Sequence, residues 1–220
     1  YFNNTVRIRT EYGREQWAFQ VGYLGSFFQN NIKDLSFENP FLTVDCLAPN
    51  GCTNATQGPA FGRVDLYPDN HANYVTFAGS FLLMKHLRLL ASINAGWLQQ
   101  DDRFLPYTSN SVLEAMTTPL PAANLQGEKQ TLAMNFKLIE TISKKFEIKA
   151  GYRHYDYNNN TRVLSLTPVQ GDFSLPGAEE NTPFGYNRKN VEVTGNWFFA
   201  KKSTAKIGYE SAALLERLMR

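Results

Sequence analysis

Two cysteines and three histidines are the residues of this 220-residue chain whose types could support redox or metal chemistry. Cys46 and Cys52 stand six positions apart in a stretch rich in Pro, Gly and Asn, which suits a small loop disulfide in an oxidising compartment better than a metal site. A redox switch at this pair is the less favoured alternative. His71, His86 and His154 are scattered, and none has a second ligand at metal-binding spacing. The sequence predicts no metal site and no haem attachment, because C-x-x-C-H is also absent.

Two further kinds of chemistry have weaker support. Asp69–Asn70 and Asp101–Asp102 offer oxygen ligands for calcium, but they lack the multi-ligand spacing of a calcium loop. A membrane-embedded hydrolase would need His154 beside a serine of a neighbouring strand, and nothing in the sequence orients such a pair. We therefore expect a protein that is not an enzyme and that binds no cofactor itself.

The composition limits the class of protein that must position these residues. Charged residues make up 19% and the mean hydropathy is −0.37, which excludes both a disordered chain and a bundle of membrane helices. The formal charge of +2 gives no reason to expect nucleic-acid binding. The aromatic content is high, with 16 Phe, 11 Tyr and 3 Trp. A soluble domain must bury such residues, whereas a membrane barrel can present them to lipid.

Apolar and polar residues alternate with period two along most of the chain, as expected for half-exposed strands. The eight segments with this pattern are 6–11, 16–28, 74–83, 87–97, 131–138, 146–153, 191–199 and 205–210. Several are longer than the roughly 5 to 6 residues usual for soluble strands. The alternatives are an antiparallel membrane sheet and a soluble sandwich with an aromatic core, and strand length favours the first.

The connections between these segments alternate in length. Tight turns are expected at Gly13–Arg14, Lys85–His86, Glu140–Ser143 and Lys201–Lys202, and long connections at 29–70, 101–127 and 158–186. This pattern is typical of an antiparallel up-and-down transmembrane β-barrel with short periplasmic turns and long extracellular loops. Residues 211–220 leave two options open, a short amphipathic helix or a frayed end of the eighth strand.

One face of the expected strands is rich in aromatic residues. A sheet can span a bilayer only as a closed barrel, so this face must look toward lipid. The predicted lipid-facing residues are Trp17, Phe19, Tyr23, Phe77, Phe81, Trp97, Phe136, Phe146, Tyr152, Trp197, Phe199 and Tyr209. Tyr155 is expected to join them near a strand end, where an amphipathic ring suits the headgroup boundary.

The opposite face carries charges of both signs. The predicted lumen-facing residues are Arg7, Arg9, Glu11, Arg88, Lys137, Glu147, Lys149, Arg153, Glu192, Lys206 and Glu210. Because burying an unpaired ion is costly, the lumen must hold water or another polar body, or form a paired network if the barrel closes at eight strands. The chain shows no leader and does not finish on a strand with a terminal aromatic residue, so we expect residues 1–220 to be a section of one larger outer-membrane barrel domain.

Six groups of residues, in order along the chain, give a more specific indication. They are Gly25–Phe28 with Leu35–Phe41, Gly62–Arg63 with Pro68–Asn70, Phe104–Thr108 ahead of Asn110, Leu120–Pro121 with Leu125–Gly127, Tyr152–Asp156, and Pro183–Tyr186. In these positions the chain resembles the MtrB/PioB family of outer-membrane barrels associated with decahaem cytochromes. The similarity covers nearly the whole chain but corresponds to an internal part of a barrel of more than twenty strands. The segment around Cys46 and Cys52 departs from the family pattern as an insertion.

The resemblance implies a sheath in the bacterial outer membrane. A periplasmic multihaem (decahaem) c-type cytochrome would insert into the barrel, and electrons would pass along its haems in extracellular electron transfer. The haem would be carried by that partner, and a cell-surface multihaem cytochrome is a second candidate partner. The alternative is a passive outer-membrane solute porin, in which inward Arg and Lys residues would tune selectivity for anions.

Overall fold

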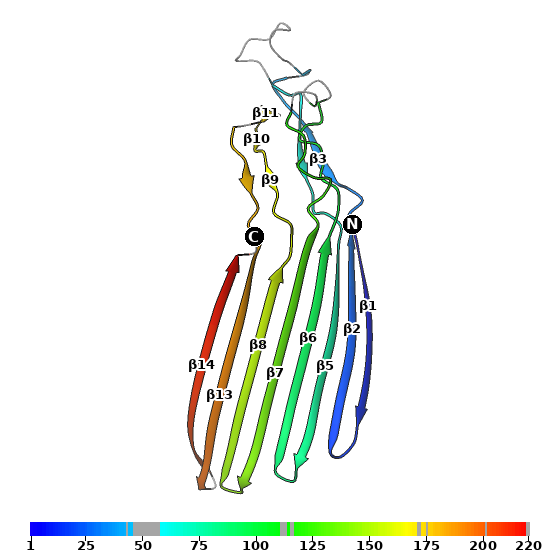
Figure 1. The fold of residues 1–220 in the computed structure, drawn as a ribbon. Helices are drawn as coiled ribbons and strands as arrows, with labels where there is room; N and C mark the ends of the chain where they lie inside the picture. The colour runs from blue at the N-terminus through cyan, green and yellow to red at the C-terminus, as the bar shows by residue number, and fades with distance from the viewer. Residues whose placement is uncertain are drawn as a thin grey trace.

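Eight long strands form one antiparallel sheet in the computed structural model (Figure 1). The structure describes residues 1–42, 44–45, 58–110, 114, 117–170, 173–174, 176–200 and 202–218. The long strands are β1 (Phe2–Gly13), β2 (Trp17–Gln29), β5 (Asn70–Met84), β6 (Leu87–Gln100), β7 (Gly127–Ser143), β8 (Phe146–Asn159), β13 (Phe184–Ala200) and β14 (Ser203–Leu218). Seven of the eight predicted segments lie within one of these strands, and the eighth, 16–28, begins one residue before β2. The prediction of an all-β, antiparallel fold is therefore confirmed.

Short hairpins join the strands at one end of the sheet, the lower end in Figure 1. Two predicted boundaries were wrong. The turn expected at Glu140–Ser143 belongs to β7, and the connection is Lys144–Lys145, because the alternating pattern continues past Glu140. Residues 211–218 are neither a helix nor a frayed end. They continue β14 and pair with β13 as far as Leu218, where Phe184 is the partner.

The strands are staggered along the sheet, which reveals their tilt. One row of paired residues runs through Trp17, Phe81, Leu89, Leu138, Ala150 and Val193. This row leaves β2 at its first residue but crosses β13 at Val193, well before that strand ends at Ala200. A shift of about seven residues at roughly 3.4 Å each, over five strand spacings of about 4.8 Å, gives a tilt of roughly 45°. Strands in outer-membrane barrels tilt by about the same angle, 35–45°.

The sheet is open in the described part of the chain. The strand order is β1-β2-β5-β6-β7-β8-β13-β14, so β1 and β14 are the two edges. Each edge strand therefore presents a row of backbone N–H and C=O groups that no described strand satisfies. Within hydrocarbon such groups must be paired, so the sheet needs further strands at both edges to span a bilayer.

The long connections cluster at the other end of the sheet and contain short strand pairs (Figure 1). β3 (Asp34–Glu38) pairs with β4 (Phe61–Asp65), β9 (Ser165–Leu166) with β12 (Glu179–Glu180), and β10 (Val169–Gln170) with β11 (Phe173–Ser174). In the described residues no helix is long and apolar enough to cross a membrane. The predicted alternation of short and long connections matches the structure.

Candidate functional site

The strand register separates the residues of the sheet into two faces. Directly paired residues share a face, and successive residues alternate. The row Arg9, Gly22, Thr76, Asn94, Ala133, Tyr155, Arg188 and Leu214 belongs to what we call the charged face. All eleven residues predicted to face a lumen lie on this face. All twelve predicted lipid-facing aromatics lie on the other, which we call the aromatic face.

Tyr155 was assigned to the wrong face. It pairs with Ala133 and Arg188 and so shares the charged face with Arg153. Tyr152 is three positions away on the same strand, and residues an odd number apart point to opposite sides of a sheet. On the charged face the ring of Tyr155 lies 5.6 Å from that of Tyr186.

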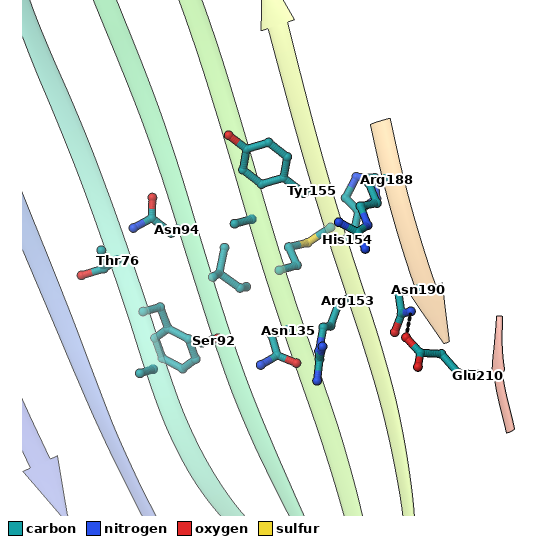
Figure 2. Close-up of a pocket in the computed structure, with 15 residues that line it drawn as sticks. Thr76, Ser92, Asn94, Asn135, Arg153, His154, Tyr155, Arg188, Asn190 and Glu210 are labelled. Atoms are coloured by element: carbon teal, nitrogen blue, oxygen red, sulfur yellow. Dashed lines mark hydrogen bonds between the residues drawn. The ribbon is translucent and has the colours of Figure 1, made fainter. Parts of the chain in front are cut away.

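A hollow of about 590 Å³ lies on the charged face (Figure 2). The polar residues of the charged face that line it come from six adjacent strands and are Thr76, Ser92, Asn94, Asn135, Arg153, Tyr155, Arg188, Asn190 and Glu210; His154 of the opposite face also belongs to the lining. A single-layer sheet encloses a hollow across six strands only where it curves around that side. The charged face is therefore the concave one, as expected for the inside of a barrel wall.

The acidic groups of the charged face are bound to neighbouring side chains. Glu147 lies 2.8 Å from the Lys149 ammonium and accepts a hydrogen bond of 2.9 Å from Asn196. Glu11 pairs with Arg9. The remaining contacts of this kind are Glu192 with Arg153 at 3.7 Å and with Thr194 at 3.3 Å, and Glu210 with Asn190 at 2.5 Å. Three of these contacts link adjacent strands and three lie within one strand, and together they satisfy most of the carboxylates within the wall.

Cations outnumber anions on the charged face. The register places nine cations there, Arg7, Arg9, Arg88, Lys129, Lys137, Lys149, Arg153, Arg188 and Lys206, against five anions, Glu11, Glu147, Glu192, Glu210 and Glu216. The excess is four positive charges. Lys129, Arg188 and Glu216 were missed in the sequence, because the expected strands stopped short of them. Extending each expected strand as far as the alternation continues would have included them.

The aromatic face has the opposite character. Large apolar side chains are exposed on it, with Tyr209 at 72% and Trp197 at 48% of their full accessible area. Close to the short hairpins the rings pack together: Trp17 lies 5.0 Å from Tyr12, and Trp197 lies 6.0 Å from Phe146. Aromatic residues are favoured at the membrane–water boundary, and this row resembles one such girdle.

Charged groups on the aromatic face lie toward the strand ends. They are Glu128, Glu140, Asp156, Lys189 and Arg217. Asp156 accepts hydrogen bonds from Asn158 at 3.0 Å and Asn187 at 3.2 Å. The middle of the aromatic face is left uncharged, as a surface in contact with hydrocarbon requires.

The structure also places the residues considered for other chemistry. His154 lies on the aromatic face, stacked on Tyr152 at 6.3 Å, and its partners in register are Met134 and Lys189 rather than a serine. His71 lies on the same face and contacts Gln99 at 2.8 Å. Cys46 and Cys52 lie outside the described residues, so their disulfide stays a prediction.

An ion cluster ties together the connections above the sheet. The Lys33 ammonium lies 2.7 Å from Asp102 and 3.0 Å from Asp69, and the Asn30 amide donates to Asp69 at 2.6 Å. The hydrogen bond from Lys33 lowers the pKa of Asp102, while that from the Asn30 backbone contributes most to the lowered pKa of Asp69. The hydrogen bonds that Lys33 donates to Asp102 and Asp69 raise the pKa of Lys33. Two of the three carboxylates considered as calcium ligands, Asp69 and Asp102, thus bind an ammonium group instead.

Comparison with known proteins agrees with this architecture. The family model described as outer membrane beta-barrel porin, MtrB/PioB, matches residues 1–213. The chain belongs to the MtrB/PioB family. The outer membrane protein MtrB of Shewanella baltica (strain OS185) is 20% identical over 211 residues, which are 96% of this chain and 28% of that protein. The chain therefore spans a little over a quarter of the length of this MtrB.

Membership of the MtrB/PioB family places the sheet and its two faces in an outer membrane. The chain is an outer-membrane β-barrel protein, and the predictions of family and location are confirmed. The open edges of its sheet agree with the short coverage of the MtrB relative, because a longer barrel has further strands to pair with β1 and β14. Porins of this architecture are not a catalytic class of protein.

Proposed function

We propose that this sheet is part of the wall of an outer-membrane sheath that encloses a multihaem c-type cytochrome. The aromatic face would contact lipid, and the charged face would line the lumen and contact the cytochrome. Electrons would cross the membrane along the haems of the partner, and the barrel would insulate them. The barrel itself would carry out no redox or hydrolytic step.

The observation that best supports this proposal is the concave, charged face on the same strands as an apolar face. A cytochrome has a polar surface that could not be exposed to hydrocarbon, whereas the charged face offers it ions, amides and hydroxyl groups. The family includes a protein named MtrB, and the association of this family with decahaem cytochromes is what the resemblance in the sequence implies. The short hairpins would be periplasmic and the long connections extracellular, as in other barrels.

A passive solute porin is the second candidate, and the description of the family as a porin favours it. An excess of four positive charges on a lumen wall would favour anions in an open pore. The two functions differ in what occupies the lumen. In the sheath it is a protein, and in the porin it is water.

The test is to purify the tagged full-length parent protein in mild detergent and to record the absorbance of haem in the same fractions. The sheath predicts that a multihaem protein co-elutes in a fixed ratio close to one per barrel. A barrel that elutes without haem and conducts ions in a planar bilayer would refute the sheath and establish the porin.

A further inference from the structure

Two arginines of the hollow extend from neighbouring strands of the charged face. Arg153 of β8 pairs with Asn190, and Arg188 of β13 pairs with Tyr155, so the two arginines are diagonal neighbours in the register. Both line the same hollow (Figure 2). Side chains as long as arginine can converge on one ligand from diagonal positions.

The charges of these arginines are incompletely neutralised. Arg153 is 3.7 Å from Glu192, longer than a good charged hydrogen bond, and its side chain is 63% exposed. Arg188 is exposed, and among the described residues no carboxylate forms a salt bridge with it. The guanidinium groups are therefore available to an external anion.

Two of the acids near the arginines, Glu210 and Glu192, are already engaged, while Glu216, the diagonal neighbour of Arg188 in the register, forms no salt bridge with it in the described part of the chain. Glu210 accepts a hydrogen bond of 2.5 Å from Asn190, which is only 6% exposed. Glu192 accepts from Thr194 as well as facing Arg153. The other polar groups of the lining are His154, the amides of Asn94 and Asn135 and a set of hydroxyl groups, which can donate or accept. The excess of donors around the hollow comes from Arg153 and Arg188, because each guanidinium offers five N–H groups and no acceptor.

We infer that this hollow binds carboxylate groups on the surface of the protein that fills the lumen, with Arg153 and Arg188 as the two anchors. The inference rests on the proposed function, since it supposes a protein occupant. A guanidinium group matches a carboxylate with two parallel hydrogen bonds, which an ammonium group cannot do. An occupant that covered both arginines without offering an acid would leave two buried charges unpaired, at a large energetic cost.

The experiment uses the full-length parent protein with its haem partner. The double variant Arg153→Gln with Arg188→Gln removes two charges and keeps polar side chains of similar length. The complexes are washed with increasing NaCl, and the ratio of haem to barrel is recorded. We expect the double variant to release haem at a lower salt concentration, with affinity reduced by about tenfold or more.

The matched control is Arg7→Gln with Arg88→Gln, which removes two cations of the charged face outside the hollow. A clearly smaller effect in the control supports a specific site. Equal effects in the two double variants would show a diffuse field of positive charge and overturn the inference, as would no effect in either. Heat-dependent gel mobility checks that each variant forms a folded barrel.

A second measurement identifies the source of the carboxylate. Arg188→Lys keeps the charge and provides an amine, which a carbodiimide joins to a nearby carboxylate. Mass spectrometry then distinguishes an Asp or Glu side chain of the partner from a haem propionate. Either product supports the inference. A partner crosslinked through Lys206 but never through residue 188 would overturn it.

The result differs if the proposed function is wrong and no cytochrome occupies the lumen. The unmodified barrel would then contain no haem, and the hollow is tested by the reversal potential of the empty barrel in a KCl gradient. Loss of anion preference in the Arg153 and Arg188 double variant, but not in the control, would retain the anion site without the protein occupant. An unchanged reversal potential would remove the site as well.

Discussion

The aromatic and charged faces are built from alternating residues of the same strands, yet they differ in where charged side chains occur and in how those side chains are paired. On the aromatic face, charges occur only toward strand ends and large apolar groups are exposed. On the charged face, ions occur along the whole length of the strands, and neighbouring side chains engage most of the carboxylates. Because the backbone is shared, the difference must come from the medium that each face contacts. The same substitution should therefore have very different effects on the free energy of unfolding at two successive positions of one strand.

The largest expected effect comes from introducing a charge on the aromatic face. Ile93 and Asn94 are successive residues of β6, on the aromatic and charged faces respectively. Ile93→Arg should lower the free energy of unfolding by about 2–4 kcal/mol if it lies near the middle of the bilayer. Asn94→Arg should cost less than about 1 kcal/mol. Urea unfolding of the full-length barrel in phospholipid vesicles measures both values, and equal costs would contradict the assignment of the faces.

A smaller effect is expected where the charged face is tightly packed. A Cβ atom on Gly96 would lie 2.6 Å from the ring of Tyr74 and from the Thr131 hydroxyl oxygen. Gly96→Ala should therefore destabilise the barrel by about 1–3 kcal/mol, through displacement of the Tyr74 ring. The control is Gly195→Ala, whose Cβ would have its nearest neighbour, Ile207, at an ordinary 3.6 Å. The same unfolding assay applies, and a neutral Gly96→Ala would show that this part of the wall is loosely packed.

The aromatic row near the hairpins should contribute less per residue pair. The rings of Trp197 and Phe146 are stacked at 6.0 Å on adjacent strands. A double-mutant cycle with Trp197→Ala and Phe146→Ala should give a coupling energy of about 0.5–1.5 kcal/mol. The pair Phe19 and Phe77, at 6.4 Å, provides a comparison. A coupling near zero would mean that lipid replaces the ring contact without loss.

The smallest effect on global stability is expected from the ion cluster above the sheet. The lowered pKa values of Asp69 and Asp102 mean that their contribution is complete above their ordinary value of 3.8 and is lost as the pH falls through the folded values. The raised pKa of Lys33 means that its contribution is complete below 10.5 and is lost at higher pH. The cluster should thus hold the connections together between about pH 4 and pH 10.5.

Asp102→Asn tests this cluster at neutral pH. Because the groups are partly exposed, the global free energy of unfolding should fall by less than about 1 kcal/mol. Cleavage of the connections by a protease should nevertheless become faster, and unmodified protein should show the same change when acidified. A cleavage rate independent of both pH and the substitution would refute a role for the cluster.

The strands were well predicted from the sequence because each strand has a different medium on each of its two sides. This imposes a period of two on the side chains. The prediction failed where that signal ended: Lys129, Arg188 and Glu216 lie in extensions of strands beyond the clearest alternation. The Lys33 cluster could not be predicted, since Asp69 and Asp102 are distant in sequence and meet only when the strands align. The diagonal placement of Arg153 beside Arg188 likewise depends on register, which the sequence alone does not determine.

The central claim is that a protein occupies the lumen, and cysteine labelling tests it directly. In a background with Cys46→Ser and Cys52→Ser, Asn94→Cys and Ile93→Cys are exposed to a maleimide that cannot cross membranes. The sheath predicts that residue 94 reacts only in cells lacking the periplasmic haem partner, and that residue 93 remains shielded by lipid in both. Equal reaction of residue 94 with and without that partner would show a water-filled pore and contradict the sheath.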